Sequence, residues 1–195
     1  MTEAGGPSPN IVLIGFMATG KSAVGRRLAR ILGRPFLDTD AEIERLVGKP
    51  VSRIFKEDGE IRFRSEEAIL CRKLAAPRGL VIATGGGIVL NPENVQNLRA
   101  GGVLIGLRAD PEVIHRRVGR KRNRPLLRGD VRGRIEALLQ ARAGAYDVAE
   151  FTVDTGEHSL REAVELIVDY LEERKHDDTR IKGGSGPAAL PDPHR

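Results

Sequence analysis

A short glycine-rich segment restricts the fold of this chain more than any other feature. It reads Gly-Phe-Met-Ala-Thr-Gly-Lys-Ser over residues 15–22, at the end of the apolar run 10–15. Residues 21–32 then show the apolar spacing of an amphipathic helix. Glycines let successive backbone N–H groups turn inward toward an anion, and the start of a helix adds positive potential. The order of apolar strand, glycine loop, Lys-Ser and helix predicts a phosphate-binding loop.

A glycine-rich turn that merely precedes a helix is the structural alternative, but it leaves the adjacent Lys21 and Ser22 unexplained. In a phosphate-binding loop, the lysine reaches the β- and γ-phosphates of a nucleotide, and the serine offers its hydroxyl to Mg²⁺. Nucleotide contacts are therefore expected from Gly15, Ala18, Thr19, Gly20, Lys21, Ser22 and Ala23.

Short apolar runs that alternate with longer helical patterns predict the rest of the fold. The runs are continuous, as expected of parallel strands covered by helices on both faces. Alternation of strands and helices implies right-handed crossovers and a three-layer α/β sandwich. Helix starts support this order: Asn91-Pro92 and Asp110-Pro111 each pair an N-cap with proline, and Ser159 to Glu162 form a capping box. The predicted strands are 10–15, 35–38, 80–84, 103–108 and 151–154.

The chain of 195 residues suits one domain, which we place at residues 10–174. Residues 1–9 predict a flexible arm, and the polar stretch 175–195, after a helix expected to end near Glu173, predicts a disordered tail. The apolar runs are too short to span a bilayer, and no secretory signal is evident, so a soluble, cytoplasmic protein is expected. Cys71, the one cysteine, lies in an amphipathic pattern that favours a packed core thiol over a nucleophile.

Polar residues after the predicted strands are candidates for an acceptor site. Asp38 and Asp40 follow the second strand, where the carboxyl ends of parallel strands face a ligand crevice. One carboxylate can support Mg²⁺ and the other can accept a proton from a hydroxyl, although Asp40 could instead cap the next helix. The glycines of residues 84–87 allow close backbone approach to a ligand, with a flexible loop as the alternative. Arg64 is either a carboxylate clamp or a surface arginine.

The net charge of +5 owes much to an arginine-rich segment over residues 116–134. Gly119 and Gly129 flank its densest part, which is typical of a mobile lid. Closure of such a lid brings an arginine onto a transferring phosphoryl group and expels water. A nucleic-acid interface is the alternative, but no aromatic residue lies between Arg108 and Arg134 to stack on bases.

Together these motifs resemble the shikimate kinase family. The resemblance covers about residues 10–173 and implies a P-loop kinase fold of the nucleoside monophosphate kinase kind, with a five-stranded parallel sheet. It also implies transfer of the γ-phosphate of ATP to the 3-hydroxyl of shikimate, with Mg²⁺. Separately, we expect a monomer that binds neither nucleic acid nor membrane. The segments that carry the resemblance are 15–22, 38–40 (Asp-Thr-Asp), 59–64 (Gly-Glu-Ile-Arg-Phe-Arg), 84–87 (Thr-Gly-Gly-Gly) and 124–127 (Arg-Pro-Leu-Leu).

For the acceptor, the resemblance implies roles for residues in and beyond the region 38–70. Asp40 would hold and activate the shikimate hydroxyl. Arg64 and Arg142 would grip the shikimate carboxylate, and Gly86 would donate its backbone N–H to the acceptor. Glu67 would orient the first of these arginines.

For the nucleotide, the resemblance implies that Ser22 and Asp38 support Mg²⁺. Arg117 would stack on adenine, and Arg124, in a lid over about residues 116–130, would meet the transferring phosphoryl group. The expected catalytic residues are therefore Lys21, Asp40 and Arg124.

One position departs from the family pattern. The family usually reads Arg-x-Pro-Leu-Tyr where this chain reads Arg142-Ala-Gly144-Ala-Tyr146, and glycine in place of proline loosens that turn. Another small-metabolite P-loop kinase, for gluconate or a nucleoside monophosphate, is the alternative function. Arg64 beside Asp40 favours a carboxylated acceptor, although gluconate is also an acid. Intact Lys21 disfavours a relative that has lost catalysis.

Overall fold

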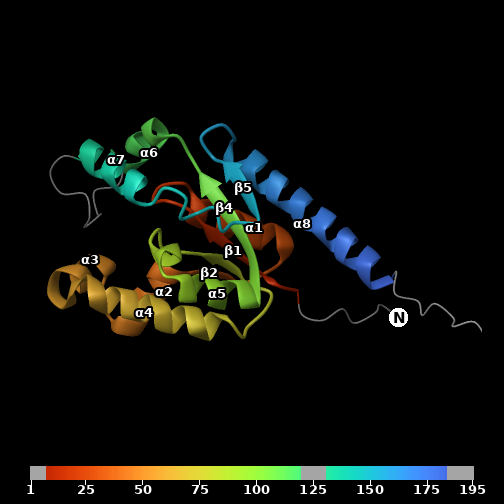
Figure 1. Ribbon diagram of the computed structural model, residues 1–195, viewed down its shortest axis with the longest axis horizontal. Coiled ribbons are helices and arrows are strands. Elements are labelled where there is room, and N and C mark those ends of the chain that lie inside the picture. Colours follow the sequence, from red (N-terminus) through yellow and green to blue (C-terminus); the bar gives the residue numbers. More distant parts are fainter. Residues whose placement is uncertain (1–7, 120–130, 184–195) are drawn as a thin grey trace, which may run out of the picture.

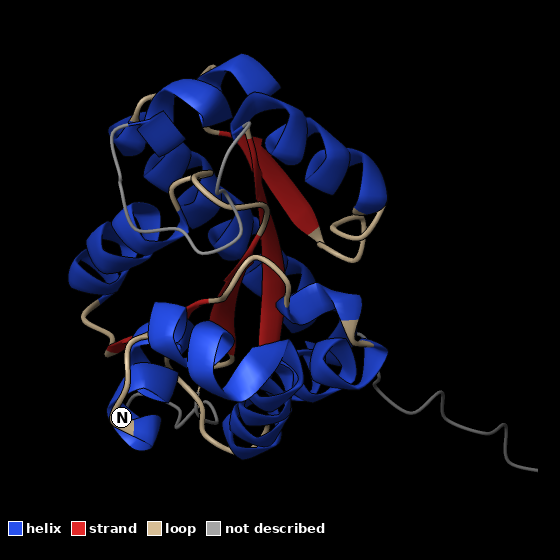
Figure 2. Ribbon diagram, turned by 90° about the vertical axis from the view of Figure 1, so that its left-hand side faces the viewer, coloured by secondary structure: helices blue, strands red, loops and turns tan. Residues whose placement is uncertain are grey.

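The computed structural model describes residues 8–119 and 131–183. Five parallel strands form one sheet in the order β2-β3-β1-β4-β5, with helices on both of its faces (Figures 1 and 2). Each strand lies near its predicted bounds, which confirms the predicted α/β sandwich with a five-stranded parallel sheet. The strands are β1 (Asn10–Ile14), β2 (Phe36–Asp38), β3 (Val81–Ala83), β4 (Gly102–Arg108) and β5 (Phe151–Asp154).

The helices follow the strands in the order expected of crossover connections. A π-helical turn, η1, and a short 3₁₀ turn, η2, join the longer elements and were not predicted from the sequence. The elements are α1 (Lys21–Leu32), α2 (Thr39–Val47), α3 (Val51–Arg53), η1 (Ile54–Asp58), α4 (Gly59–Leu74), η2 (Ile88–Leu90), α5 (Pro92–Gly101), α6 (Pro111–Gly119), α7 (Val131–Ala141) and α8 (Leu160–Gly183).

The central strand β1 explains why the apolar runs are continuous. Ile11 and Leu13 pack into a cluster with residues of α1 and α8, whereas Val12 and Ile14 point to a second cluster with residues of α2, α4 and α5. All four side chains are fully buried. Burying a side chain of this size stabilises the fold by about 1.5–3 kcal/mol, so the core on both faces fixes the sheet that carries the site.

Side-chain caps begin three of the predicted helices. The Asn91 side chain accepts from the Glu93 N–H at 2.9 Å, and Asp110 accepts from the Glu112 N–H at 2.8 Å. At the start of α8, the Ser159 N–H donates to the Glu162 carboxylate at 2.7 Å and the Glu162 N–H donates to the Ser159 hydroxyl at 3.3 Å, which confirms the predicted capping box.

Helix α8 is longer than predicted. Its expected end near Glu173 is wrong, because no proline or glycine interrupts the chain until Gly183, where the helix stops. The first part of the predicted disordered tail is therefore helical, and residues 184–195 lie outside the described residues. The long helix projects from the body of the molecule in Figure 1.

The predicted core thiol is confirmed. Cys71 is fully buried, and burial, with a smaller contribution from Glu67, raises the pKa of its thiol to about 12. A thiol with that pKa carries almost no thiolate at neutral pH, so it is not a nucleophile. Within the described ranges, no helix is both long and apolar enough to cross a membrane.

Candidate active site

A cavity of about 440 Å³ opens at the carboxyl edge of the sheet. There β1 leads into the phosphate-binding loop, β2 into α2, and β3 into the loop of residues 84–87. This is the edge at which parallel sheets place their ligands. The lining residues are Met17, Ala18, Gly20, Lys21, Ser22, Ala23, Asp38, Asp40, Thr84, Gly86 and Arg117.

Most of the predicted site residues within the described ranges meet at this cavity. Gly15, Thr19, Arg64 and Arg142 do not line its wall. Arg124, the predicted lid arginine, lies outside the described residues, as do residues 120–130 of the predicted lid.

Backbone geometry gives residues 15–22 the shape of a phosphate loop. Gly15 has φ +146° and Gly20 has φ +93°, conformations that favour glycine. Ala18, at φ +62°, is the one non-glycine residue with positive φ among the residues described. This left-handed conformation costs about 1–2 kcal/mol for a residue with a Cβ, so the surrounding contacts must hold it.

Two side chains within the loop brace its backbone. The Thr19 hydroxyl donates to the Phe16 carbonyl at 2.8 Å. The Lys21 ammonium donates to the Gly15 and Phe16 carbonyls at 2.8 and 2.7 Å. The Thr19 side chain therefore stabilises the loop backbone. The Lys21 ammonium lies beside the loop, from where it can turn toward a phosphate.

Asp38 joins the phosphate loop to α2. One carboxylate oxygen accepts from the Ser22 hydroxyl at 2.6 Å, and the other accepts from the Asp40 and Ala41 N–H groups at 3.2 and 3.4 Å. Asp38 is thus the N-cap of α2, and Asp40 lies in its first turn. The alternative interpretation of Asp40 as an N-cap is wrong, and Asp40 instead lines the cavity.

Ser22 and Asp38 fit a magnesium site. Their side-chain oxygens lie 2.6 Å apart on the wall that also carries Lys21. Mg²⁺ prefers hard oxygen ligands and is usually bound by one or two protein side chains together with phosphates and water.

The glycine loop after β3 gathers three charged side chains from α2 and α4. A Cβ atom on Gly85 would lie 2.5 Å from Asp40 Oδ1 and 2.9 Å from Glu67 Oε1. A Cβ atom on Gly87 would lie 2.6 Å from Arg64 Nη1. A side chain at either position would displace these charged groups, because they pack directly on the backbone of the loop.

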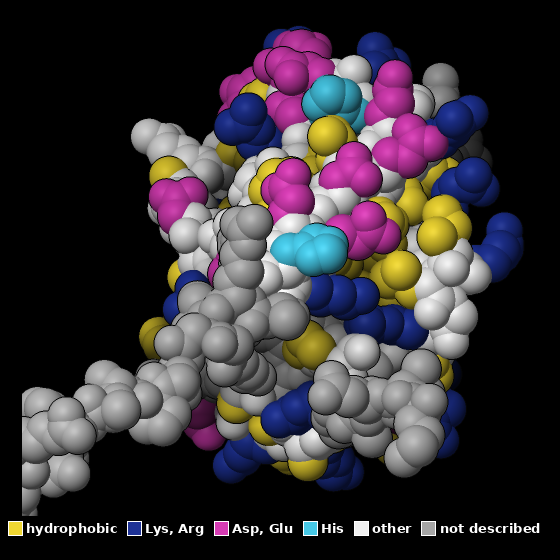
Figure 3. All heavy atoms as spheres, turned by 90° about the vertical axis from the view of Figure 1, so that its right-hand side faces the viewer, with side chains coloured by type: hydrophobic (Ala, Val, Ile, Leu, Met, Phe, Trp, Pro, Cys, Tyr) yellow, Lys and Arg dark blue, Asp and Glu magenta, His cyan; other side chains and the backbone are white. Residues whose placement is uncertain are grey.

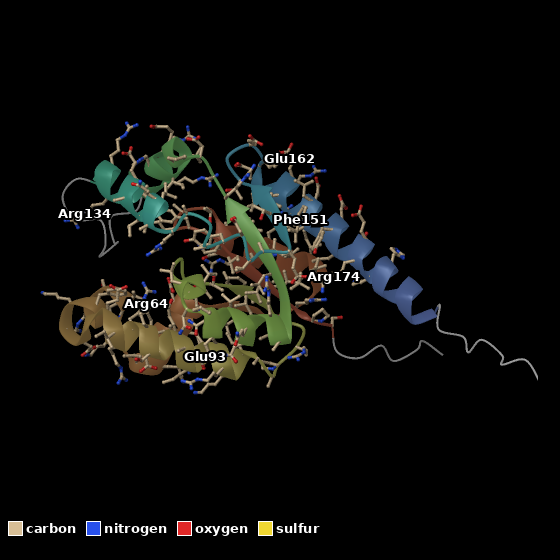
Figure 4. All side chains as sticks on the ribbon, in the orientation of Figure 1. Arg64, Glu93, Arg134, Phe151, Glu162 and Arg174 are labelled. Carbon is tan, nitrogen blue, oxygen red and sulfur yellow. The ribbon has the colours of Figure 1, made fainter. Side chains whose placement is uncertain are left out.

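Arg64 lies on the side of α4 that faces the rest of the molecule (Figure 4). It donates to Glu67 at 2.6 Å, and to Glu60 at 3.1 and 2.8 Å. Burial alone would lower the pKa of Arg64, but the two glutamates raise it. These ion pairs hold the guanidinium charged and oriented, as expected of a clamp for an anion.

Glu67 is almost fully buried, at 1% exposure. Burial raises the pKa of its carboxyl group, Arg64 opposes that rise, and the nearby charge of Asp40 adds to it. In a simple ion pair the pKa of the carboxyl group would fall, but here it rises because burial is the largest influence. Glu67 is thus a second acid beside Asp40. Its hydrogen bond with Arg64 agrees with the predicted role of orienting that arginine.

Arg142 and Tyr146 converge on the same glycine loop. Arg142 donates to the Gly86 carbonyl at 3.1 Å, and the Tyr146 hydroxyl donates to that carbonyl at 2.7 Å. The Arg142 guanidinium lies over the Phe16 ring, 5.7 Å from its centroid. Both side chains hold Gly86, and Tyr146 is a contributor that sequence reasoning missed although it ends the Arg-x-x-x-Tyr motif.

Arg117 reaches the phosphate loop from α6. It donates to the Ala18 carbonyl at 3.2 Å and to the Thr155 hydroxyl at 2.9 Å. Thr155, directly after β5, is a second residue that sequence reasoning missed. The one signal available was its position directly after a predicted strand.

Known proteins that resemble this chain support the same kind of site. The family model described as shikimate kinase matches residues 17–172. A shikimate kinase of Desulforudis audaxviator is 74% identical over 177 residues, covering 91% of this chain and 94% of that protein. One from Pelotomaculum thermopropionicum is 66% identical over 168 residues, covering 86% and 98%.

A solved structure agrees. The shikimate kinase of Acinetobacter baumannii, determined in complex with shikimate, superposes with a TM-score of 0.81 at 37% identity, covering 86% of this chain and 95% of that one. With a family model over most of its length and relatives of this identity, the chain belongs to the shikimate kinase family.

Proposed function

We propose that this chain transfers the γ-phosphate of ATP to the 3-hydroxyl of shikimate, giving shikimate 3-phosphate and ADP. One observation carries the proposal: Asp40 lines the same cavity as Lys21, and Arg64 is packed on the glycine loop beside it. A base for a hydroxyl and a cation for a carboxylate thus stand next to a phosphate loop. A hydroxy acid with both groups fits this arrangement.

The protein acts mainly by positioning and by charge stabilisation. The backbone of residues 15–22 and the start of α1 bind the phosphates, and Lys21 offsets charge on the transferring group. Asp40 accepts the proton of the attacking hydroxyl. A bond forms between the hydroxyl oxygen and the γ-phosphorus, the bond from that phosphorus to the β–γ bridging oxygen breaks, and ADP leaves with the electron pair.

Ser22 and Asp38 would hold Mg²⁺, which when bound neutralises charge on the phosphate oxygens. Asp38 also contacts two parts of the site, since one carboxylate oxygen accepts from Ser22 of the phosphate loop and the other caps α2. The start of α2 in turn places Asp40. A single carboxylate thereby ties the nucleotide half of the site to the acceptor half.

Arg64 and Arg142 would grip the shikimate carboxylate, and the Gly86 N–H would donate to the acceptor. Support comes from the glycine loop: Arg64 packs on Gly87, and Arg142 binds the Gly86 carbonyl. Arg117 would bind the nucleotide, as expected of a cavity-lining cation beside the phosphate loop. Arg124 would reach the phosphoryl group from the lid.

We further propose one catalytic domain over residues 10–174, acting as a cytoplasmic monomer that binds no nucleic acid. A buried lone thiol suits a reducing compartment. On the face shown in Figure 3, Asp and Glu side chains gather in the upper part and Lys and Arg lie around them. On this face, the charges of the described side chains are mixed, in contrast to the basic stripe of a nucleic-acid-binding surface.

Replacing Arg64 by alanine is expected to raise the KM for shikimate by about 50-fold, because charge-assisted hydrogen bonds to a carboxylate are lost. The KM for ATP should stay close to the wild-type value. Steady-state assays with each substrate varied in turn measure both. Arg62→Ala is the matched control, since Arg62 lies on the same helix and pairs with Glu66 at the surface. A parallel rise in both KM values for Arg64→Ala would remove the clamp assignment.

Placing the proline of the family pattern at position 144 is expected to weaken the binding of shikimate. Gly144 has φ +75°, which proline cannot adopt, and the turn that it makes follows directly after Arg142. Gly144→Pro should therefore displace Arg142 and raise the KM for shikimate by about tenfold. The KM for ATP, measured in the same assays, is the internal control. An unchanged or improved KM for shikimate would mean that the turn does not place Arg142.

A further inference from the structure

Thr155 lies where three parts of the nucleotide half of the site meet. It follows β5 directly and is 6% exposed. Its hydroxyl oxygen lies 2.9 Å from the Thr19 carbonyl of the phosphate loop, 3.1 Å from the Arg108 carbonyl at the end of β4, and 2.9 Å from Arg117 Nη1. One small buried side chain thus contacts the loop, the sheet and a cavity-lining cation.

The donors and acceptors around this hydroxyl can be assigned by counting hydrogens. A hydroxyl has one hydrogen, so it serves only one of the two carbonyls at a time. The Arg108 carbonyl already accepts from the Thr155 N–H at 2.9 Å. The Thr19 carbonyl is also the nearer of the two to the hydroxyl. The shorter of the two distances assigns the hydroxyl hydrogen to the Thr19 carbonyl, and the hydroxyl oxygen accepts from Arg117.

Arg117 is held at two points of the same residue. One terminal nitrogen donates to the Thr155 hydroxyl, and the other donates to the Thr155 carbonyl. The first nitrogen also reaches the Ala18 carbonyl at 3.2 Å. Ala18 and Thr19 lie in the loop where Ala18 has its left-handed backbone, so these contacts act on the part of the loop that most needs support.

We propose that Thr155 is a positioning residue for the nucleotide. Its hydroxyl links Arg117 to the phosphate loop and holds both in the positions that bind ATP. The link runs from the Arg117 guanidinium through the Thr155 oxygen to the Thr19 carbonyl, and each bond polarises the next. The methyl group of a β-branched side chain restricts its χ1 rotation, which favours a fixed bridge. This inference rests on the proposed role of Arg117 in nucleotide binding.

Two substitutions separate the hydroxyl from the shape of the side chain. Thr155→Val keeps the branched shape and removes the donor and acceptor, whereas Thr155→Ser keeps the hydroxyl. Thr155→Val is expected to raise the KM for ATP, and the Kd for ADP measured by calorimetry, by about tenfold. The KM for shikimate should not change, and Thr155→Ser should restore ATP binding. Thr152→Val, at an exposed position of the same strand, is the matched control.

A double-mutant cycle with Arg117→Met tests the route of the effect. If Thr155 acts through Arg117, the valine substitution should have a much smaller effect on the KM for ATP in the Arg117→Met background. Additive effects of the two substitutions would contradict the link. A Thr155→Val protein that melts at a lower temperature yet keeps its ADP affinity would overturn the inference, since a purely structural residue behaves in that way.

Failure of this inference is distinguishable from failure of the proposed function. Wild-type protein assayed with ATP and shikimate in the same experiment tests the function itself. Active wild-type enzyme with unaltered nucleotide affinity in Thr155→Val contradicts only the role of Thr155.

Discussion

Replacing Asp40 by asparagine is expected to lower kcat for shikimate phosphorylation by about 10³-fold, with small changes in either KM. Asparagine keeps the size and the hydrogen-bonding oxygen of aspartate but cannot accept a proton from the attacking hydroxyl. The geometry supports a role in the chemical step, because Asp40 lines the cavity and its Oδ1 packs beside Gly85. Steady-state kinetics with both substrates saturating measure the loss.

A matched control shows whether the effect comes from the site. Asp169→Asn makes the same chemical change at an exposed position of α8 and should leave kcat unaltered. The α2 cap comes from Asp38 rather than Asp40, so the Asp40→Asn protein should melt near the wild-type temperature. A kcat within about tenfold of wild type would exclude Asp40 as the base, since general-base catalysis contributes at least about 10².

Replacing Lys21 by methionine is expected to reduce kcat by about 10³-fold as well, the upper range for loss of one preorganised electrostatic contact. Methionine matches the apolar stem of lysine and removes the charge. In the structure, the ammonium is bound by the Gly15 and Phe16 carbonyls, so it must turn from the loop to the phosphates when ATP binds. Single-turnover measurements separate this loss of chemistry from a loss of binding.

This substitution should also lower the stability of the fold. Methionine leaves the buried Gly15 and Phe16 carbonyls without the ammonium donor, which costs about 1–3 kcal/mol, so the melting temperature is measured beside kcat. Lys73→Met, at an exposed position of α4, is the control for the same change outside the cavity. If Lys21→Met retains more than about a tenth of the wild-type kcat, the lysine does not stabilise the transferring phosphoryl group.

The sheet and the phosphate loop could be predicted from the sequence because each depends on local signals. β1 is buried on both faces, so every residue from Ile11 to Ile14 is apolar, and the following glycines and Lys-Ser occupy fixed places. Helix α1 begins and ends where its pattern does, at Lys21 and at Leu32 before Gly33. In these segments, propensity, burial and backbone conformation all favour the same structure.

Asp38 and Asp40 mark the limit of that approach. Both are acids after a strand, and each could serve as an N-cap by residue type. The choice depends on where β2 ends, and helix boundaries vary by a residue or two under small differences in packing. Only the structure places the cap at Asp38, with the Ser22 hydroxyl on its other oxygen.

Contacts between distant segments could not be predicted in this way. Tyr146 binds the Gly86 carbonyl, and Thr155 binds the Thr19 carbonyl, from positions far along the chain. The sequence does not indicate which backbone carbonyl accepts a side-chain hydrogen bond, because every residue has a carbonyl. The π-helical turn η1 is similar: Gly59 marks its end, but residue type does not distinguish a π-helical turn from an α-helical one.

The central claim is that this cavity delivers the γ-phosphate of ATP to a hydroxyl of a carboxylated acceptor. The direct test follows ADP release with shikimate, gluconate, AMP or CMP as the acceptor and identifies the products by ³¹P NMR. With shikimate, one new phosphomonoester should appear in equal amount to ADP, whereas the other acceptors should yield little product. Equal or faster phosphorylation of gluconate or a nucleotide, or ADP release without any phosphorylated shikimate, would contradict the claim.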